Sequence, residues 1–146
     1  MGAYNFKFEK ILNLKLKEEE QQEDKYLRLK TELKNAKQRL SDLNKEKETV
    51  YADLRENESD LCSNIDFRNY LKQLREKEKE IVEIISKKER ETEAQLQVLM
   101  EKKKERKTLE KLKEKEEEKF IKEFLAEEQK EIDELSINYS MGGRII

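Results

Sequence analysis

The strongest constraint on the fold is a single repeating stripe of residues that favour burial. Between Tyr26 and Leu61 such residues recur at alternating spacings of three and four, which places them on one narrow face of an α-helix. Two polar members of this stripe, Lys47 and Asn57, are interruptions of the kind that fix register at some cost in stability. The stripe is the seam of a coiled coil. Its positions are Tyr26, Leu29, Leu33, Ala36, Leu40, Leu43, Lys47, Val50, Leu54, Asn57 and Leu61.

Composition alone leaves two classes open. Charged residues make up 47% of the 146 residues and hydrophobic ones 34%, whereas about a quarter of an average globular domain is charged. Too few large apolar side chains remain for a layered globular core. The chain is therefore either a disordered polyelectrolyte or a long-helix protein, and the periodic seam favours the second class.

A second stripe, from Phe67 to Leu112, shows how the chain pairs with itself. Extended upstream to Leu12 and Phe8, the first stripe passes through the acidic block EEEQQED at 18–24, and the second stripe is interrupted by the basic block EKKKERK at 101–107. If the chain folds back about Cys62, the two blocks face each other and the apolar positions pair. The pairs are Leu54 with Tyr70, Val50 with Leu74, Leu43 with Ile81, Leu40 with Ile84, Leu29 with Leu96, and Leu12 with Leu112. This register predicts an all-α protein, an antiparallel two-helix coiled-coil hairpin with a longer second helix; an uninterrupted helix that dimerises in parallel is the alternative.

The predicted boundaries follow from local signals. We expect an N-terminal extension at 1–5 and a single hairpin at 6–139, made of a helix at 6–58, a tip at 59–63 and a helix at 64–139. Ser63 and Asp66 are spaced as a capping box, and Cys62 and Phe67 as a hydrophobic staple. Gly142 and Gly143 predict a helix stop, with residues 140–146 as a flexible tail.

The second helix is expected to extend beyond the first. The register places Phe120 opposite Tyr4, so the residues that follow have no partner in the chain. Apolar residues nevertheless continue there at helical spacing, and an uncovered apolar stripe usually marks a protein contact. They are Ile121, Phe124, Leu125, Ile132 and Leu135. In the alternative, the N-terminal aromatic residues Tyr4, Phe6 and Phe8 fold over part of this stripe.

The residue types needed for catalysis are scarce. The chain has no His, one Cys and no Gly-rich phosphate loop, so we expect no catalytic, cofactor-binding or metal site and no enzymatic activity. A net charge of −2 with interspersed signs argues against nucleic-acid binding. No apolar run is long enough for membrane insertion, and the N-terminus does not resemble a secretory signal, so a cytoplasmic protein is expected.

Both ends of the chain carry a distinctive pattern. The start, MGAYNFKFEKILNLKLKEEEQQ, has an aromatic-rich opening followed by a Leu- and charge-rich helix. The segment KTLEKLKEKEEEKFIKEFLAEEQKEIDELSINY has EQKEIDE at 128–134 as its most specific part. The two segments resemble the opening and the C-terminal pattern of the FliJ family of flagellar export proteins. The resemblance implies a monomeric stalk-like component of the flagellar type III export apparatus, peripheral to the inner face of the membrane.

The resemblance also implies partners. The end with both termini would enter the ring of the export ATPase FliI, the tip would contact the export gate protein FlhA, and export chaperones would bind as well. Carried onto this sequence, the ATPase-binding residues are Phe8, Leu12, Leu16, Phe120, Phe124, Gln129, Lys130, Glu131, Ile132 and Asp133. The gate-binding residues are Leu43, Val50, Tyr51, Tyr70 and Leu74.

Some of these assignments compete with packing. Leu43, Val50 and Leu74 are also seam positions, whereas Tyr51 lies off the stripe. Two alternatives to the flagellar stalk remain at this point. One is a purely structural coiled coil, either a spacer or a parallel dimer, and the other is the equivalent stalk protein of a virulence type III secretion system.

Overall fold

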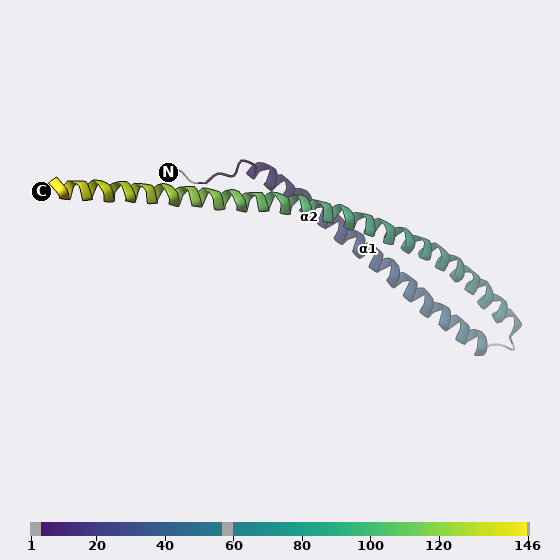
Figure 1. The fold of residues 1–146 in the computed structure, drawn as a ribbon. Helices are drawn as coiled ribbons and strands as arrows, with labels where there is room; N and C mark the ends of the chain where they lie inside the picture. Colours follow the sequence, from purple (N-terminus) through teal and green to yellow (C-terminus); the bar gives the residue numbers. More distant parts are fainter. Residues whose placement is uncertain (1–3, 57–59, 146) are drawn as a thin grey trace. The chain divides into compact units, whose positions relative to one another are not determined.

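The computed structural model describes residues 4–56 and 60–145, with side chains placed for all of these except Ser63 and residues 141–145. Two helices account for nearly all of them, α1 (Glu9–Glu56) and α2 (Leu61–Ile145). They pack antiparallel as a helical hairpin, and α2 is the longer (Figure 1). The predicted fold class is confirmed, and within the described ranges there is no strand.

The chain divides into two compact units. The terminal unit consists of Met1–Glu19 and Lys102–Ile146, and the turn unit consists of Glu20–Glu101. Each unit contains one part of α1 and one part of α2. They are described separately below because each has its own way of holding the two helices together.

Apolar packing holds the turn unit together. Leu43 and Val50 of α1 form one buried cluster with Leu71 and Leu74 of α2, and Phe67 and Ile81 pack against its edge. Leu74 is the most buried side chain, with 1% of its surface exposed. This cluster contains two predicted pairs, Val50 with Leu74 and Leu43 with Ile81. The predicted register is therefore confirmed here.

The polar seam positions of the turn unit form a pair of their own. Lys47 Nζ donates to a carboxylate oxygen of Glu78 across the two helices, and both side chains are partly buried. A buried ion pair is costly to place out of register because each charge would lose its partner. The pair therefore favours one alignment of α1 against α2.

Ion pairs connect α1 to α2 in the terminal unit. Glu18 accepts from Lys102 Nζ at 3.2 Å, and Lys15 Nζ lies 3.0 Å from Glu105. Glu19, which is buried, accepts from two guanidinium nitrogens of Arg106. The contacts of Glu18 and Glu19 join the predicted acidic block to the predicted basic block. The charge match that the sequence suggested is confirmed for Glu18 and Glu19.

The helix starts differ from the predicted ones. The amide of Glu9 donates to the carbonyl of Phe6 at 3.2 Å, so Phe6 to Phe8 form a turn and α1 begins at Glu9 rather than at residue 6. α2 begins at Leu61, and the Asp60 carbonyl accepts the amide of Asn64 at 3.0 Å as its first helical bond. Ser63 therefore lies inside the first turn of α2. The predicted capping box is wrong because Asp60, not Ser63, directly precedes the helix.

Two further expectations concern the turn and the C-terminus. Cys62 is exposed on the first turn of α2, so it does not form the predicted staple with Phe67. The predicted end of the first helix at residue 58 and the start of the tip at Ser59 lie outside the described residues, which resume at Asp60. At the other end α2 continues to Ile145, past the predicted stop at Gly142 and Gly143. No described glycine has a positive φ, and a glycine with helical φ weakens a helix without ending it.

Candidate protein-docking surfaces

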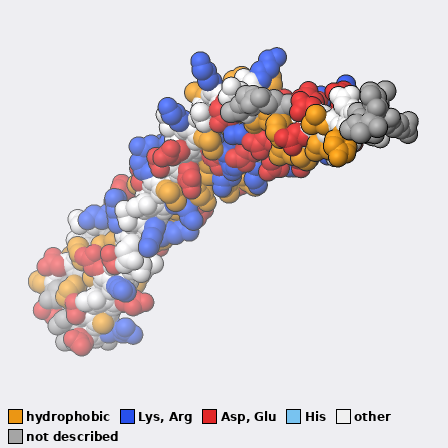
Figure 2. Space-filling model, turned by 90° about the vertical axis from the view of Figure 1, so that its left-hand side faces the viewer, with side chains coloured by type: hydrophobic (Ala, Val, Ile, Leu, Met, Phe, Trp, Pro, Cys, Tyr) orange, Lys and Arg blue, Asp and Glu red, His pale blue; other side chains and the backbone are white. Residues whose placement is uncertain are grey.

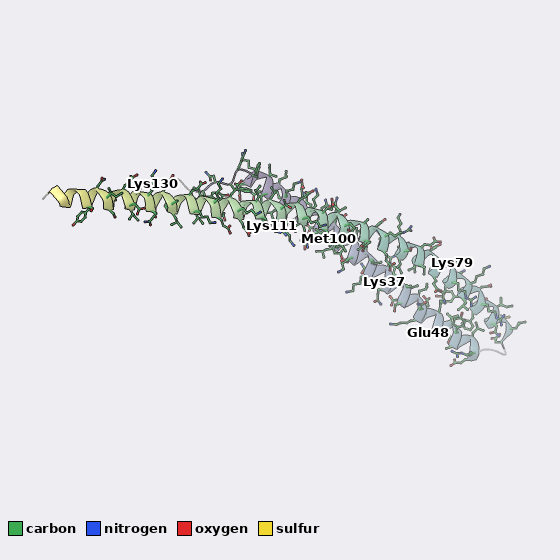
Figure 3. All side chains as sticks on the ribbon, in the orientation of Figure 1. Lys37, Glu48, Lys79, Met100, Lys111 and Lys130 are labelled. Atoms are coloured by element: carbon green, nitrogen blue, oxygen red, sulfur yellow. The ribbon has the colours of Figure 1, made fainter. Side chains whose placement is uncertain are left out.

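The terminal unit carries an uncovered apolar face on the last part of α2, which we call the free stripe. Its five members are Ile121, Leu125, Ile132, Leu135 and Tyr139. Each is more than half exposed, from 54% for Ile121 to 86% for Tyr139. Their spacings of four, seven, three and four residues place them on one face of the helix. Figure 3 labels Lys130 at the middle of this stretch, and no other segment of the described residues lies beside α2 there.

From Tyr4 onward, the described N-terminal residues pack against α2 just before the start of the free stripe. The ring of Tyr4 packs on Phe120 with 5.4 Å between centroids, which confirms the predicted pairing. The Tyr4 hydroxyl donates to Glu116 at 3.4 Å, and burial together with the Glu116 carboxylate raises the pKa of Tyr4. Phe6 is buried and meets Phe8 edge to face. The N-terminal aromatic residues thus contact α2 at Phe120, and the five members of the free stripe are exposed.

The residues expected to bind the ATPase all lie in the terminal unit, but they differ in accessibility. Leu12 is buried, and Phe8, Phe120 and Phe124 are half-buried. Leu16 is exposed, and so are the five residues 129–133. Within the latter, Gln129 Nε2 donates to Asp133 Oδ1 at 3.0 Å along the helix. The exposed members are available to a partner, whereas Leu12 holds α1 against α2.

The residues expected to bind the gate lie in the turn unit and separate into two groups. Leu43, Val50 and Leu74 belong to the buried cluster and cannot contact a partner while the hairpin stays closed. Tyr51 and Tyr70 are each 39% exposed. Tyr51 accepts from Arg75 Nη2 at 2.8 Å, and Tyr70 donates to the carboxylate of Glu46, which raises the pKa of Tyr70.

A groove beside Tyr51 was not expected from the sequence. It lies in the turn unit, has a volume of about 930 Å³, and is open to solvent. Its lining residues are Glu48, Tyr51, Leu54, Arg55, Arg68, Asn69, Leu71, Lys72 and Arg75. The spacing of Arg68, Lys72 and Arg75 at i, i+4 and i+7 was the available signal, because it puts three cations on one face of a helix.

Among the described residues, no three His, Cys, Asp or Glu side chains gather in a way that could hold a metal ion. No described helix has a stretch both long and apolar enough to cross a membrane. Acidic and basic side chains are intermixed over the face that Figure 2 presents.

These features define a class of protein, a helical hairpin that presents exposed apolar and charged surfaces. A family model described as "Flagellar FliJ protein" matches residues 4–143, so the chain belongs to the FliJ family of flagellar export proteins. Members of this family are non-catalytic components of the export apparatus, so the chain is not an enzyme. A search of curated proteins and a search of solved structures each returned no significant match.

Proposed function

We propose that this chain is the stalk-like component of the flagellar export apparatus that binds the ring of the ATPase FliI through its terminal unit. One observation carries the proposal: the free stripe is apolar, lies on one face of α2, and is left uncovered by the N-terminal segment. A contiguous exposed apolar face of this kind is typical of a protein interaction site. Family membership supports an export-apparatus partner.

The proposed ATPase contact consists of the free stripe and the exposed residues beside it. Leu16, Phe124 and residues 129–133 are on the terminal unit and are at least partly accessible. Apolar contacts would provide most of the affinity, since a fully buried large side chain contributes about 1.5–3 kcal/mol. The exposed polar residues at 129–133 would determine the orientation of the helix in the ring.

The mechanism is non-enzymatic. A hairpin seated in a ring of ATPase subunits contacts each subunit differently, so it biases which subunit closes on ATP and promotes assembly of the ring. By thermodynamic linkage, ATP binding by the ring would in turn change the affinity for the hairpin. The turn unit would contact the gate protein FlhA through Tyr51 and Tyr70, and export chaperones would bind the same hairpin. The chain would act as a monomer in the cytoplasm, at the export apparatus on the inner face of the membrane.

The antiparallel hairpin argues against the parallel dimer, because each helix already has its partner within the chain. The match to a flagellar family favours the flagellar system over the virulence system. A role as a passive spacer is the remaining alternative. It predicts no effect on ATP hydrolysis.

The test measures ATP hydrolysis and ring formation by the export ATPase with and without this chain. We expect the full chain to increase both, and we expect a chain truncated after Phe120 to increase neither. Truncation at this point keeps the contact between Tyr4 and Phe120, so the pairing of α1 with α2 is retained. Equal stimulation by the full and truncated chains would refute the proposed contact.

A matched pair of substitution variants separates loss of the site from loss of general apolar surface. The test variant changes Ile121→Ser, Leu125→Ser and Ile132→Ser. The control variant changes three similarly exposed residues of α2 in the turn unit, Val82→Ser, Ile84→Ser and Val98→Ser. Loss of even two apolar contacts weakens binding by about a hundredfold. We expect the test variant alone to lose stimulation.

A further inference from the structure

The groove in the turn unit combines an apolar floor with a basic rim. Leu71 is buried at its base, Leu54 is half-buried, and the ring of Tyr51 is partly exposed beside them. Contributions come from both α1 and α2, so the groove exists only in the folded hairpin. Figure 3 labels Glu48, which marks the α1 side of the groove.

The charges around the groove are unbalanced, although the whole chain carries a net charge of only −2. Four lining residues are cations and one, Glu48, is a carboxylate. The cations are Arg55, Arg68, Lys72 and Arg75, and all four are exposed. An excess of positive charge at one surface site favours a negatively charged partner.

The groove cations differ from other cations of the turn unit in the partners they have. In the described part of the chain Arg75 donates to the neutral hydroxyl of Tyr51, and no carboxylate forms an ion pair with Arg55, Arg68 or Lys72. Other cations of the turn unit do have carboxylate partners, as Lys47 has Glu78 and Lys88 has Glu32. The groove cations are thus available to an external carboxylate.

We propose that this groove binds an acidic peptide segment that carries one large apolar side chain. The apolar side chain would lie on Tyr51 and Leu54, and carboxylates on either side of it would pair with Arg68, Lys72 and Arg55. Arginine suits this role because its planar guanidinium can bind a carboxylate through two parallel hydrogen bonds. The inference names the chemistry of the partner at the turn, and it rests on the proposed function only in treating the turn unit as a docking end.

A peptide fits the groove better than a nucleic acid or a membrane surface does. Both of those ligands are extended polyanions that need a basic face or stripe. The groove offers four cations around an apolar floor rather than an extended basic face, and the whole chain carries a net charge of −2. The apolar floor would also remain unused by a phosphate backbone.

The test is a binding titration of the full chain, followed by fluorescence anisotropy. The probe is a fluorescein-labelled peptide of Glu and Asp residues around a single central Leu. One variant reverses two rim charges, Arg68→Glu and Lys72→Glu. Its matched control, Lys77→Glu, changes an exposed lysine of the same helix outside the groove. Thermal unfolding followed by circular dichroism verifies that both variants remain folded.

We expect the double variant to weaken peptide binding by about tenfold or more, because two attractions become repulsions, and the control to have little effect. A peptide with Gly in place of Leu should bind more weakly than the Leu peptide. The proposal is overturned if the double variant binds as the unchanged chain does. It is also overturned if anionic vesicles or single-stranded DNA bind at the groove while the peptide does not.

A second measurement separates this inference from the proposed gate contact. The cytoplasmic part of FlhA is captured on the unchanged chain, on the double variant and on the control variant. If peptide binding depends on the rim charges but gate capture does not, the groove binds acidic peptides but does not bind the gate protein. Gate capture by all three chains without any peptide binding would instead refute the groove and keep the gate contact.

Discussion

The terminal unit and the turn unit hold the same two helices together in different ways. In the turn unit Leu43, Val50, Leu71 and Leu74 form a buried apolar cluster. In the terminal unit ion pairs connect α1 to α2, and the free stripe of α2 is exposed. Apolar side chains of the turn unit are therefore buried between the two helices, whereas those of the free stripe in the terminal unit are available to a partner. Stability and function are expected to respond to mutation in different places.

The largest effect on stability is expected at Leu74. The change Leu74→Ala removes the most buried side chain of the turn unit, and a core substitution of this type costs about 2–5 kcal/mol. Chemical denaturation followed by circular dichroism measures the free energy of unfolding. The matched change in the terminal unit is Leu125→Ala, whose side chain is 56% exposed. We expect it to alter stability by less than about 0.5 kcal/mol while it weakens ATPase stimulation. Similar losses of stability at both positions would contradict the contrast between the units.

A smaller effect is expected at the buried ion pair of the terminal unit. Glu19 accepts hydrogen bonds from two nitrogens of Arg106. The change Glu19→Gln removes the negative charge of this side chain and preserves its size. Hydrogen bonds to charged groups contribute about 1.5–3 kcal/mol, and Arg106 keeps Glu110 at 2.8 Å as a second partner. We therefore expect a loss of about 1–2 kcal/mol in denaturant unfolding. The control, Glu32→Gln, breaks a more exposed pair with Lys88 and should cost less. A larger loss of stability for Glu32→Gln than for Glu19→Gln would show that burial does not determine how much these ion pairs contribute to stability.

The pairing of the helices could be predicted from the sequence because several independent signals agree on one register. The alignment that pairs Val50 with Leu74 also places Glu18 near Lys102 and Tyr4 on Phe120. A shift of α1 along α2 by a few residues would break all three of these contacts. The helix ends lacked such agreement, since Asp60 and Ser63 are both good residues to precede a helix and differ by only one turn. Local signals of similar strength cannot decide between them.

The sites were less predictable than the fold. An exposed end of α2 follows from the unequal lengths of the helices, so the free stripe was expected. The groove beside Tyr51 depends on how residues of α1 and α2 meet in space, and a single helix pattern does not contain that information. At Leu43, Val50 and Leu74 the resemblance indicated contact with a partner while the seam indicated burial. The structure places them in the core because their apolar surface is used by the opposite helix.

Acid should weaken the terminal unit through its ion-pair network. The hydrogen bond from Lys102 lowers the pKa of Glu18, and the hydrogen bond from Lys15 lowers the pKa of Glu105. A carboxyl group whose pKa is lowered by folding stabilises the fold above its unfolded value, here 4.5. That stabilisation is lost as the pH falls from 4.5 through the folded value. We therefore expect the variant Glu18→Gln with Glu105→Gln to be less stable than the unchanged chain at pH 7.

The same pair of proteins provides the control. At a pH below the lowered folded pKa values both carboxyl groups are protonated in the folded and the unfolded chain, so the unchanged chain and the double variant should have nearly the same thermal midpoint. Thermal unfolding at pH 7 and at low pH measures the two differences. A difference between the chains that is as large at low pH as at pH 7 would show that these carboxylates do not act through their charge.

The smallest effect is expected at the C-terminal end of α2, at Gly142 and Gly143. The helix passes through both glycines without a positive φ, so helix propensity at these two positions affects its local stability. Ala exceeds Gly in helix propensity by about 1 kcal/mol per residue. The variant Gly142→Ala with Gly143→Ala should therefore increase helical content at residues 140–145, as measured by carbon chemical shifts, and leave global unfolding unchanged. A glycine that ended the helix in the left-handed region would give the opposite result, because Ala is disfavoured there and helical content would fall. The sign of this change thus distinguishes a continuous helix from a glycine stop, even though the change in global stability is close to zero.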